Sequence, residues 1–316
     1  MNKHRRAFLN QVSLMAGAAI LSRPMASVAA VSKKLNSIHS AAKNITIYHT
    51  NDLHGNINPV INNMGGLRQV KTLLKNQDTG GLLLDAGDFL SAAHSTIQQH
   101  ELVAAMNNMG YIAATPGSNE LLLGEDTLAG LIPHMQFRLV NCNYQFEGVL
   151  QKLITPYTIV NSGKFKIGIT GIGHRVKGIK YLDPIQSANK TAQILKEKEN
   201  CDLVICLSHL GYSQKDDMPD SQKLAAQSEN IDLVINGYNN KLLKDPIIAL
   251  NKQKREVIIS HAAWGGLMMS RVVFGFEGKQ KNEIKAKNII AGQGSGQTSD
   301  EMIAEIRSVS KRLASA

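Results

Sequence analysis

The sequence is poor in aromatic residues and in cysteine. Aromatic side chains make up 5% of the 316 residues, and the three cysteines are Cys142, Cys201 and Cys206. Their number is odd and their spacing is not that of a zinc site, so neither a disulfide framework nor a Cys-rich metal site is expected. Cys201 and Cys206 lie on one apolar run, where we expect them to be buried as small hydrophobic residues.

Acidic residues are also scarce relative to basic ones, and the formal net charge is +10. A nucleic-acid binder usually gathers Lys and Arg on one face with aromatic residues between them. Here the excess is spread along the chain and aromatics are few, so we expect a basic solvated surface and no nucleic-acid partner. The hydrophobic content of 43% is enough for one globular domain with tails.

Long hydrophobic runs are absent, and the most apolar stretch near the start is short. Residues 1–30 combine a basic beginning, a short apolar segment and small residues up to Ala29 or Ala30. This pattern is typical of a secretory signal peptide, and its apolar core is too short to span a bilayer stably. Arg5 and Arg6 in HRRAFLN resemble a twin-arginine signal. We therefore expect a polar leader over 31–43 and a periplasmic or extracellular protein without stable membrane insertion after processing.

Apolar runs rich in Val, Ile and Leu alternate with helical patterns beyond residue 43. The expected strands are 45–50, 81–86, 111–115, 137–141, 165–172, 202–207, 231–236, 256–261 and 268–276. The expected helices are 65–76, 97–109, 123–132, 187–200, 219–229 and 299–313. Such alternation predicts βαβ units and a largely parallel sheet in a domain over 44–290, followed by a flexible linker and one helix over 291–316.

Polar residues follow the ends of several expected strands. In α/β proteins the chemistry gathers in the loops beyond the carboxyl ends of the parallel strands. The residues found there are Asp52 and His54, Asp88, Ser118 and Asn119, His209, and Tyr238 to Asn240. We therefore expect these side chains to lie in one crevice.

Asp52, His54, Asp88 and His209 are the candidate metal ligands among these residues. Asp52 and His54 are two residues apart, and Gly87 before Asp88 allows a tight turn that aims its carboxylate into the crevice. Imidazole combined with carboxylate suits zinc, iron or manganese. Taken singly, each residue has an ordinary alternative role as a turn former, a cap or a satisfied histidine.

The motifs occur in an order that resembles the catalytic domain of 5′-nucleotidase-type metallophosphoesterases. The motifs are HTNDLHG, LLLDAGD, a Gly-x-x-Glu loop at 117, SHLG, IDLVINGYNN and HAAWGG, within residues 43 to 276. The resemblance implies a four-layer α/β/β/α sandwich and two metal ions that activate a water for attack on a phosphate ester. It implies that Asp52 and His54 hold the first metal, that Asp88 bridges both and that His209 holds the second.

Two loops depart from the family motifs. The family has Gly-Asn-His-Glu where this chain has Gly117-Ser118-Asn119-Glu120, and Gly-His-x-His where this chain has Gly237-Tyr238-Asn239-Asn240. Ser118, Tyr238 and Asn240 thus replace metal ligands, and Asn119 replaces the catalytic histidine. His49, His94 and His261 are not expected to substitute for the lost imidazoles.

The substrate implied by the resemblance is a phosphate ester of unspecified class, with a nucleotide as one candidate. We expect no second domain with base-stacking aromatics after the linker, and therefore no platform for a nucleoside. Two functions stay open at this point. The chain is either an exported phosphoesterase with impaired activity or an inactive protein of the same fold that binds a ligand or partner. The site would accordingly hold one divalent ion, two ions, or none.

Overall fold

The computed structural model describes residues 43–215, 217–238, 242–292 and 298–315. The expected signal peptide at 1–30 and the leader up to residue 42 lie outside these residues, as do Asn240 and most of the expected linker. Among the described helices, none is both long and apolar enough to cross a bilayer.

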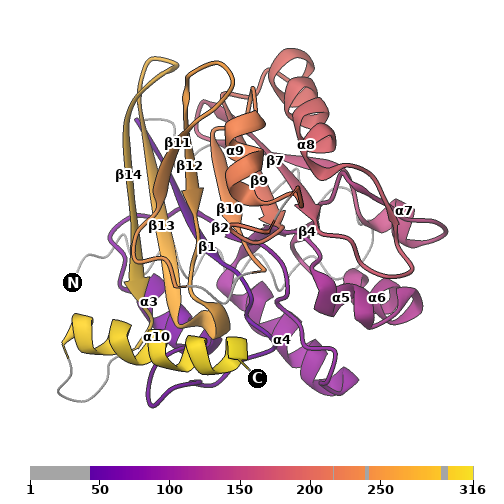
Figure 1. The fold of residues 1–316 in the computed structure, drawn as a ribbon, viewed down its shortest axis with the longest axis vertical. Coiled ribbons are helices and arrows are strands. Elements are labelled where there is room, and N and C mark those ends of the chain that lie inside the picture. The colour runs from indigo at the N-terminus through magenta and orange to yellow at the C-terminus, as the bar shows by residue number, and fades with distance from the viewer. Residues whose placement is uncertain (1–42, 216, 239–241, 293–297, 316) are drawn as a thin grey trace.

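Two six-stranded mixed sheets form the centre of the molecule (Figure 1). The first has the order β14-β13-β1-β2-β3-β4 and the second β11-β12-β10-β9-β7-β6. The first sheet consists of β1 (Asn44–Thr50), β2 (Leu82–Asp85), β3 (Tyr111–Ala114), β4 (Arg138–Leu139), β13 (Met268–Glu277) and β14 (Gln280–Ile290). The second consists of β6 (Tyr157–Ser162), β7 (Phe165–Gly173), β9 (Leu203–His209), β10 (Leu233–Asn236), β11 (Ile247–Leu250) and β12 (Glu256–Ser260). A small third sheet pairs β5 (Tyr144–Gln145) with β8 (Lys180–Tyr181).

Helices cover the outer face of each large sheet. Those packed on the first sheet are α3 (Gly66–Lys75), α4 (Thr96–Met109) and α6 (Glu125–Leu131), and those on the second are α8 (Pro184–Gln193) and α9 (Ser221–Gln227). Short helices occur at α5 (Ser118–Leu122), α7 (Leu150–Leu153), Ile132–His134 and Trp264–Gly266, and α8 continues as a π-helical turn over Ile194–Lys198. The result is the expected four-layer α/β/β/α sandwich.

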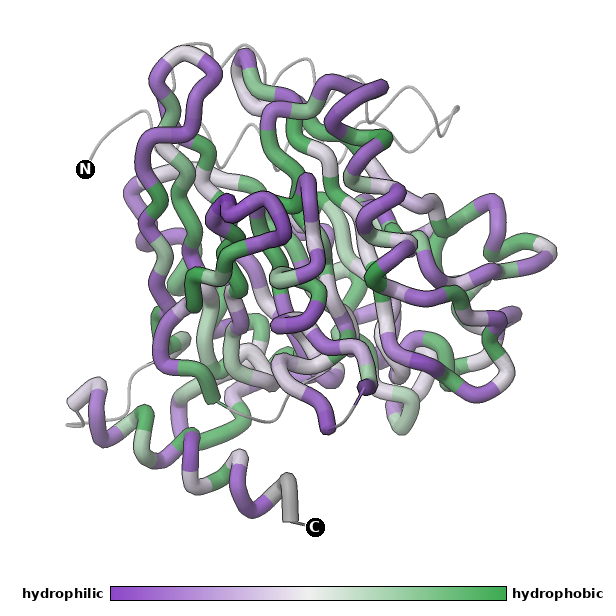
Figure 2. Tube along the Cα trace, turned by 45° about the horizontal axis from the view of Figure 1, so that its top comes forward, coloured by the Kyte–Doolittle hydropathy of each residue, from purple (hydrophilic) through white to green (hydrophobic). Residues whose placement is uncertain are grey.

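Residue alternation explains why the sheets pack in this way. In β1, Ile45 and Ile47 face the second sheet, whereas Tyr48 packs under the helices of the first. β9 lies between two apolar layers, and all seven of its residues are buried. Figure 2 shows hydrophobic segments along the interior strands and hydrophilic ones along the connecting loops. The period-2 pattern therefore places each strand between its sheet partner and a helix layer.

The expectation of a largely parallel sheet was wrong in part. The centres are parallel, but β13, β14, β6 and β11 pair antiparallel with their neighbours. β14 was missed because its sequence, QKNEIKAKNII, is charged and exposed, as suits a sheet edge. β6, β11 and the short β5, β8, α5 and α7 were also missed. Most of the remaining boundaries agree within one to three residues, although the strand expected at 137–141 covers only Arg138–Leu139.

Helix α10 (Ser299–Ser315) packs against the end of the first sheet, near α3 (Figure 1). Thr298 and Glu301 form a capping box at its start. Met302 and Ile306 are buried in a small apolar cluster with Met64 and Leu267. The Trp264 indole N–H donates to Ser310 Oγ at 2.8 Å, so the helix is fastened to the loop that precedes β13.

His49, on β1, is fully buried, and its Nε2 atom lies 2.7 Å from Ser260 Oγ. Burial, together with the charge of nearby His261, lowers the pKa of His49 to about 3. The side chain is therefore neutral inside the fold across the physiological pH range.

We expect Ile306→Ala to lower the free energy of unfolding by about 2–4 kcal/mol, because it removes a fully buried side chain. Chemical denaturation measures this change. Arg307→Ala, on the exposed face of the same helix, is the control, with an expected change within about 0.5 kcal/mol. Equal effects of both variants would mean that α10 does not contribute to the core.

The buried His49 predicts a specific dependence of stability on pH. Between the ordinary pKa near 6.5 and the folded value near 3, the unfolded chain binds a proton that the folded chain does not. The folded state should lose up to about 1.4 kcal/mol per pH unit from this group as the pH falls through that window. In urea unfolding from pH 6.5 to 4.5, His49→Gln should show a shallower loss than the unsubstituted chain. Parallel profiles would contradict this assignment.

Candidate metal centre

The loops that follow β1 and β2 continue the parallel pairing of these strands. Asp52 N donates to Gly87 O at 2.9 Å, and His54 N donates to Asp88 O at 2.8 Å. Leu53 and Phe89 are fully buried beside these bonds and anchor both loops in the core. The backbone thus sets Asp52 and His54 next to Asp88 at the carboxyl ends of the strands.

The backbone conformation is unusual at the same place. Asp52, His54, Asp88 and Tyr238 all have φ between 49° and 60°, whereas only three other described non-glycine residues have positive φ. Such conformations are unfavourable for residues with a Cβ atom and gather at functional sites. The loops therefore hold these four residues in a left-handed backbone conformation that is unfavourable for non-glycine residues.

Asp52, His54 and Asp88 each offer one ligand atom, and the three atoms all lie within 4.8 Å of one another. Asp52 and Asp88 are buried, while 37% of the His54 side chain is exposed, so the cluster opens to solvent on the His54 side. Asp52 Oδ2 accepts from Asn51 Nδ2 at 2.8 Å, which fixes the carboxylate. Three of the four expected metal ligands thus converge on one position.

Asp88 is also surrounded by donors from the loop after β3. Asn119 N donates to Asp88 Oδ1 at 2.7 Å, and Ser118 Oγ donates to Oδ2 at 3.1 Å and lies 3.3 Å from Oδ1. Burial alone would raise the pKa of Asp88, but the interaction with His209 and the hydrogen bond from the Asn119 amide hold it below its usual range. The carboxylate is therefore ionised and well satisfied.

His209 approaches Asp88 from the end of β9 and is completely buried. Its Nδ1 atom donates to Ala86 O at 2.8 Å, so Nε2 points toward Asp88. Nε2 lies 3.4 Å from Asp88 Oδ1, within range of a charge interaction but outside hydrogen-bond geometry. Burial would lower the pKa of His209, but the charges of Asp88 and Asp52 raise it to about 9.

Sequence reasoning overlooked the role of Glu120. This fully buried carboxylate accepts from Asp88 N at 3.0 Å, Gly117 N at 2.7 Å and Leu90 N at 2.7 Å. Burial, followed by the charge of Asp88, raises the pKa of Glu120 to about 8. The final residue of the Gly-x-x-Glu motif thus joins the loops after β2 and β3. Its position three residues after Gly117 was the signal in the sequence.

The departures from the family motif have their own partners. The Asn119 side chain turns to the loop at Ala92, where its Oδ1 accepts from Ala92 N at 3.4 Å. Tyr238 N donates to Asp52 Oδ1 at 3.0 Å, and the Tyr238 ring stacks on His174 with a centroid distance of 3.9 Å. His174 was not singled out in the sequence. Asn240 lies outside the described residues.

The three other histidines considered in the sequence have other contacts in the structure. His49 contacts Ser260, and the Nδ1 atom of His261 lies 2.9 Å from Asn236 O. His94 packs against Gly55, where an added Cβ atom would lie 2.5 Å from its imidazole. None of the three belongs to the group of converging ligand atoms found among the described residues.

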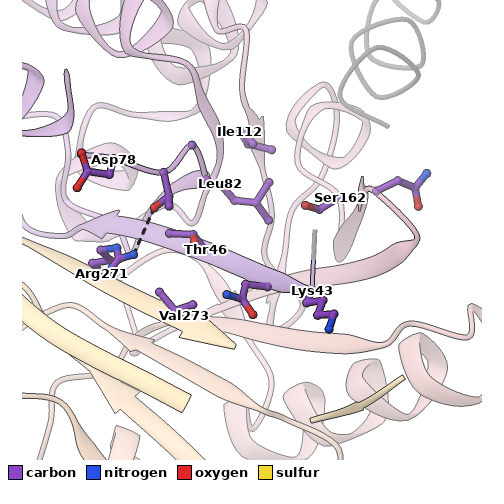
Figure 3. Close-up of a pocket in the computed structure, with 13 residues that line it drawn as sticks. Lys43, Thr46, Asp78, Leu82, Ile112, Ser162, Arg271 and Val273 are labelled. Carbon is purple, nitrogen blue, oxygen red and sulfur yellow. Dashed lines mark hydrogen bonds between the residues drawn. The ribbon is translucent and has the colours of Figure 1, made fainter. Parts of the chain in front are cut away.

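A cavity of about 410 Å³ lies at the other end of β1, away from this cluster (Figure 3). It is bordered by the start of β1, the loop before β2 and part of β13. Lys43, Asp78 and Arg271 are among its charged residues, and Arg271 Nη2 donates to Thr79 Oγ1 at 3.3 Å. Because it adjoins the amino end of β1, this cavity is separate from the candidate site.

The donor set fits one divalent cation better than two. Two carboxylates and one imidazole converge on a position open to solvent, which suits a transition-metal ion that keeps a water ligand. On the other side of Asp88, the buried Nε2 atom of His209 makes no hydrogen bond and is one nitrogen that could serve there as a metal ligand. There, however, Asp88 Oδ1 already accepts from a backbone amide, and the Tyr238 ring stands beside His209 at a centroid distance of 5.4 Å.

Comparison with known proteins shows the family to which the chain belongs. The family model described as calcineurin-like phosphoesterase matches residues 45–237. A snake venom 5′-nucleotidase from Gloydius brevicauda is 26% identical over 66% of this chain and 39% of its own. A 5′-nucleotidase from Vibrio cholerae is 28% identical over 62% of this chain and 40% of its own. The chain thus spans about two fifths of the length of these curated relatives.

A solved structure supports the fold. The 5′-nucleotidase precursor from Thermus thermophilus superimposes with a TM-score of 0.71 over 86% of this chain and 59% of that one, at 22% identity. This family uses divalent metals, and Asp52, His54 and Asp88 lie within the matched segment. The fold and the matched segment together show that the chain belongs to the calcineurin-like phosphoesterase family.

Proposed function

We propose that this chain is an exported, 5′-nucleotidase-like phosphoesterase that binds one divalent ion at Asp52, His54 and Asp88 and hydrolyses phosphate esters poorly. The observation that carries the proposal is the convergence of three ligand atoms within 4.8 Å at the carboxyl ends of β1 and β2. Zinc, manganese and iron are the ions that suit this mixture of carboxylate and imidazole.

The chain's own residues would hold and orient the reacting groups. A divalent ion bound there would polarise the phosphate ester and lower the pKa of a coordinated water. Asn51 fixes the Asp52 carboxylate, and Glu120 fixes the backbone of Asp88. The exposed side of His54 leaves room for a phosphate to enter from solvent.

The described residues around His209 do not provide enough ligands for a second ion. The Asp88 oxygen nearest to His209 is already bonded to the amide of Asn119, and Ser118 Oγ contacts both carboxylate oxygens. Tyr238, at the position of a family ligand, instead stacks on His174. His209 is thus left as one imidazole without the ligands that would complete a second site.

The loss of the family histidine at Asn119 weakens the chemical step. The Asn119 side chain is directed to Ala92, and an amide cannot donate a proton to a leaving group as a histidine does. Losing one such transition-state group typically lowers the rate by roughly 10²–10³. An inactive protein that binds a ligand is the second candidate, favoured by the same contacts of Ser118, Asn119 and Tyr238.

The substrate class and the location rest on other observations. Relatives whose names describe nucleotidases support a phosphate ester, and a nucleotide is one candidate. Export rests on the pattern of residues 1–30, including the paired Arg5 and Arg6, which lies outside the described part of the structure. No macromolecular partner is proposed.

The purified protein should bind about one manganese or zinc ion per chain, because Asp52, His54 and Asp88 are the one group of converging ligands in the described part of the chain. Elemental analysis after dialysis measures the stoichiometry. Asp88→Asn should weaken binding by at least about 100-fold, since changes to residues that merely support the ligands already reach about 10- to 100-fold. Asp126→Asn, an exposed residue on α6, is the matched control and should leave binding unchanged. No bound metal in the unsubstituted protein would overturn the proposed function.

Restoring the family side chains should restore both the second ion and the reaction. We expect Ser118→Asn, Asn119→His, Tyr238→His and Asn240→His together to raise the stoichiometry to about two and phosphate release from an aryl phosphate by at least about 10². The same variant without Asn119→His is the control and should gain the ion with little gain in rate. A four-residue variant that still binds one ion would show that more than these side chains prevents the second site.

A further inference from the structure

Tyr238 is an exposed aromatic side chain at the edge of the candidate site. Its relative exposure is 43%, whereas most large aromatic residues of the described chain are buried. The ring is stacked on His174 with an interplanar angle of 20° and a centroid distance of 3.9 Å. The two residues come from separate loops, after β10 and after β7. Their contact therefore joins two loops at the mouth of the site.

The pair is held firmly from both sides. Tyr238 N donates to Asp52 Oδ1, and both the backbone N and the Nδ1 atom of His174 lie within 3.2 Å of His209 O. Gly237 allows the Tyr238 loop to pack closely against the loop after β2, because an added Cβ atom would lie 2.4 Å from Ala86 O. The ring is thus anchored by the residues next to it, so its position does not depend on a ligand.

One face of the ring is available to a ligand. His174 covers one face, and the more distant His209 ring is tilted by 53° at a centroid distance of 5.4 Å. Tyr238 is nevertheless 43% exposed, which leaves the face opposite His174 as the surface that a ligand could approach. A fixed aromatic face open to water at a binding site is a natural stacking surface for a planar ring.

The surroundings specify what such a ring should carry. The candidate metal centre attracts an anionic group, and Arg175 and Lys177 add exposed positive charge on the loop that carries His174. Because Tyr238 N donates to Asp52 Oδ1, the residue that carries the ring is in direct contact with a candidate metal ligand. A ligand with its aromatic ring attached directly to the phosphate would reach both, whereas the ribose of a nucleotide would carry the base farther away.

We propose that the His174–Tyr238 stack is an aromatic platform that receives the ring of an aryl phosphate whose phosphate lies at Asp52, His54 and Asp88. This inference rests on the proposed function, because it requires the anion to bind at the candidate metal centre. It makes Tyr238 the residue that determines specificity for the ester group, a role distinct from the metal ligation that its position has in the family.

Calorimetric titration of the manganese-loaded full chain tests the platform with three probes. Inorganic phosphate reports the anion site alone, while phenyl phosphate and cyclohexyl phosphate differ chiefly in whether their ring is planar and aromatic. Phenyl phosphate should bind about 3- to 10-fold more tightly than cyclohexyl phosphate, the range that a stacked aromatic pair provides. This ratio is the quantity to follow in each variant.

Tyr238→Ala should reduce the ratio to about one, and Tyr238→Phe should keep it, because the phenylalanine ring offers the same face. His174→Ala should lower it by removing the support behind the ring. Ile248→Ala, an exposed apolar residue on edge strand β11, is the control and should leave it unchanged. A ratio near one in the unsubstituted protein, or equal ratios in the alanine and phenylalanine variants, would overturn the platform while phosphate binding stands. If neither inorganic phosphate nor phenyl phosphate binds, the proposed function fails together with the platform.

Discussion

The carboxylate of Asp88 is the group on which the geometry of the loops at the carboxyl ends of the strands depends. A buried carboxylate is stable only when donors or opposite charges satisfy it. Asp88 finds such partners on the loops after three other strands, namely His54 after β1, Asn119 after β3 and His209 at the end of β9. Since β9 belongs to the second sheet, this one side chain connects both sheets of the sandwich at their functional edge.

Two further buried carboxyl groups support the loop that carries Asp88. Asp85 accepts from Thr50 Oγ1 at 2.6 Å and from Gly87 N at 2.8 Å, and Glu120 accepts the amides of Gly117, Asp88 and Leu90. Burial raises the pKa of Asp85 to about 7 and that of Glu120 to about 8. Both groups accept from backbone amides and so shape the loops, while the carboxylates of Asp52 and Asp88 converge with His54. The two pairs of acidic residues therefore differ in role because they contact different atoms.

The sequence was informative where a local pattern determines the outcome. The apolar runs of β1, β2 and β9 and the polar residues after them predicted the strands, their common edge and the meeting of Asp52, His54 and Asp88. It was less informative where the partner is distant. The charged strand β14 becomes a strand only because β13 pairs with it, and the His174–Tyr238 stack joins residues 64 positions apart. The metal ligation by these residues, the domain limits and the export signal stay predictions.

The residues that depart from the family motif form a consistent set. Ser118 and the amide of Asn119 satisfy the Asp88 oxygens, and Tyr238 lies against His174 beside His209. Three bonds that build the loops, Asp52 N to Gly87 O, His54 N to Asp88 O and Tyr238 N to Asp52 Oδ1, begin at backbone amides and do not use the side chains of Ser118, Asn119 or Tyr238. The loop backbone can therefore persist while the side chains it presents change. For the same reason, substitutions at Ser118, Asn119 and Tyr238 can replace ligand side chains of a two-ion centre by side chains that contact their neighbours. The group formed by Asp52, His54 and Asp88 is not disturbed by such substitutions.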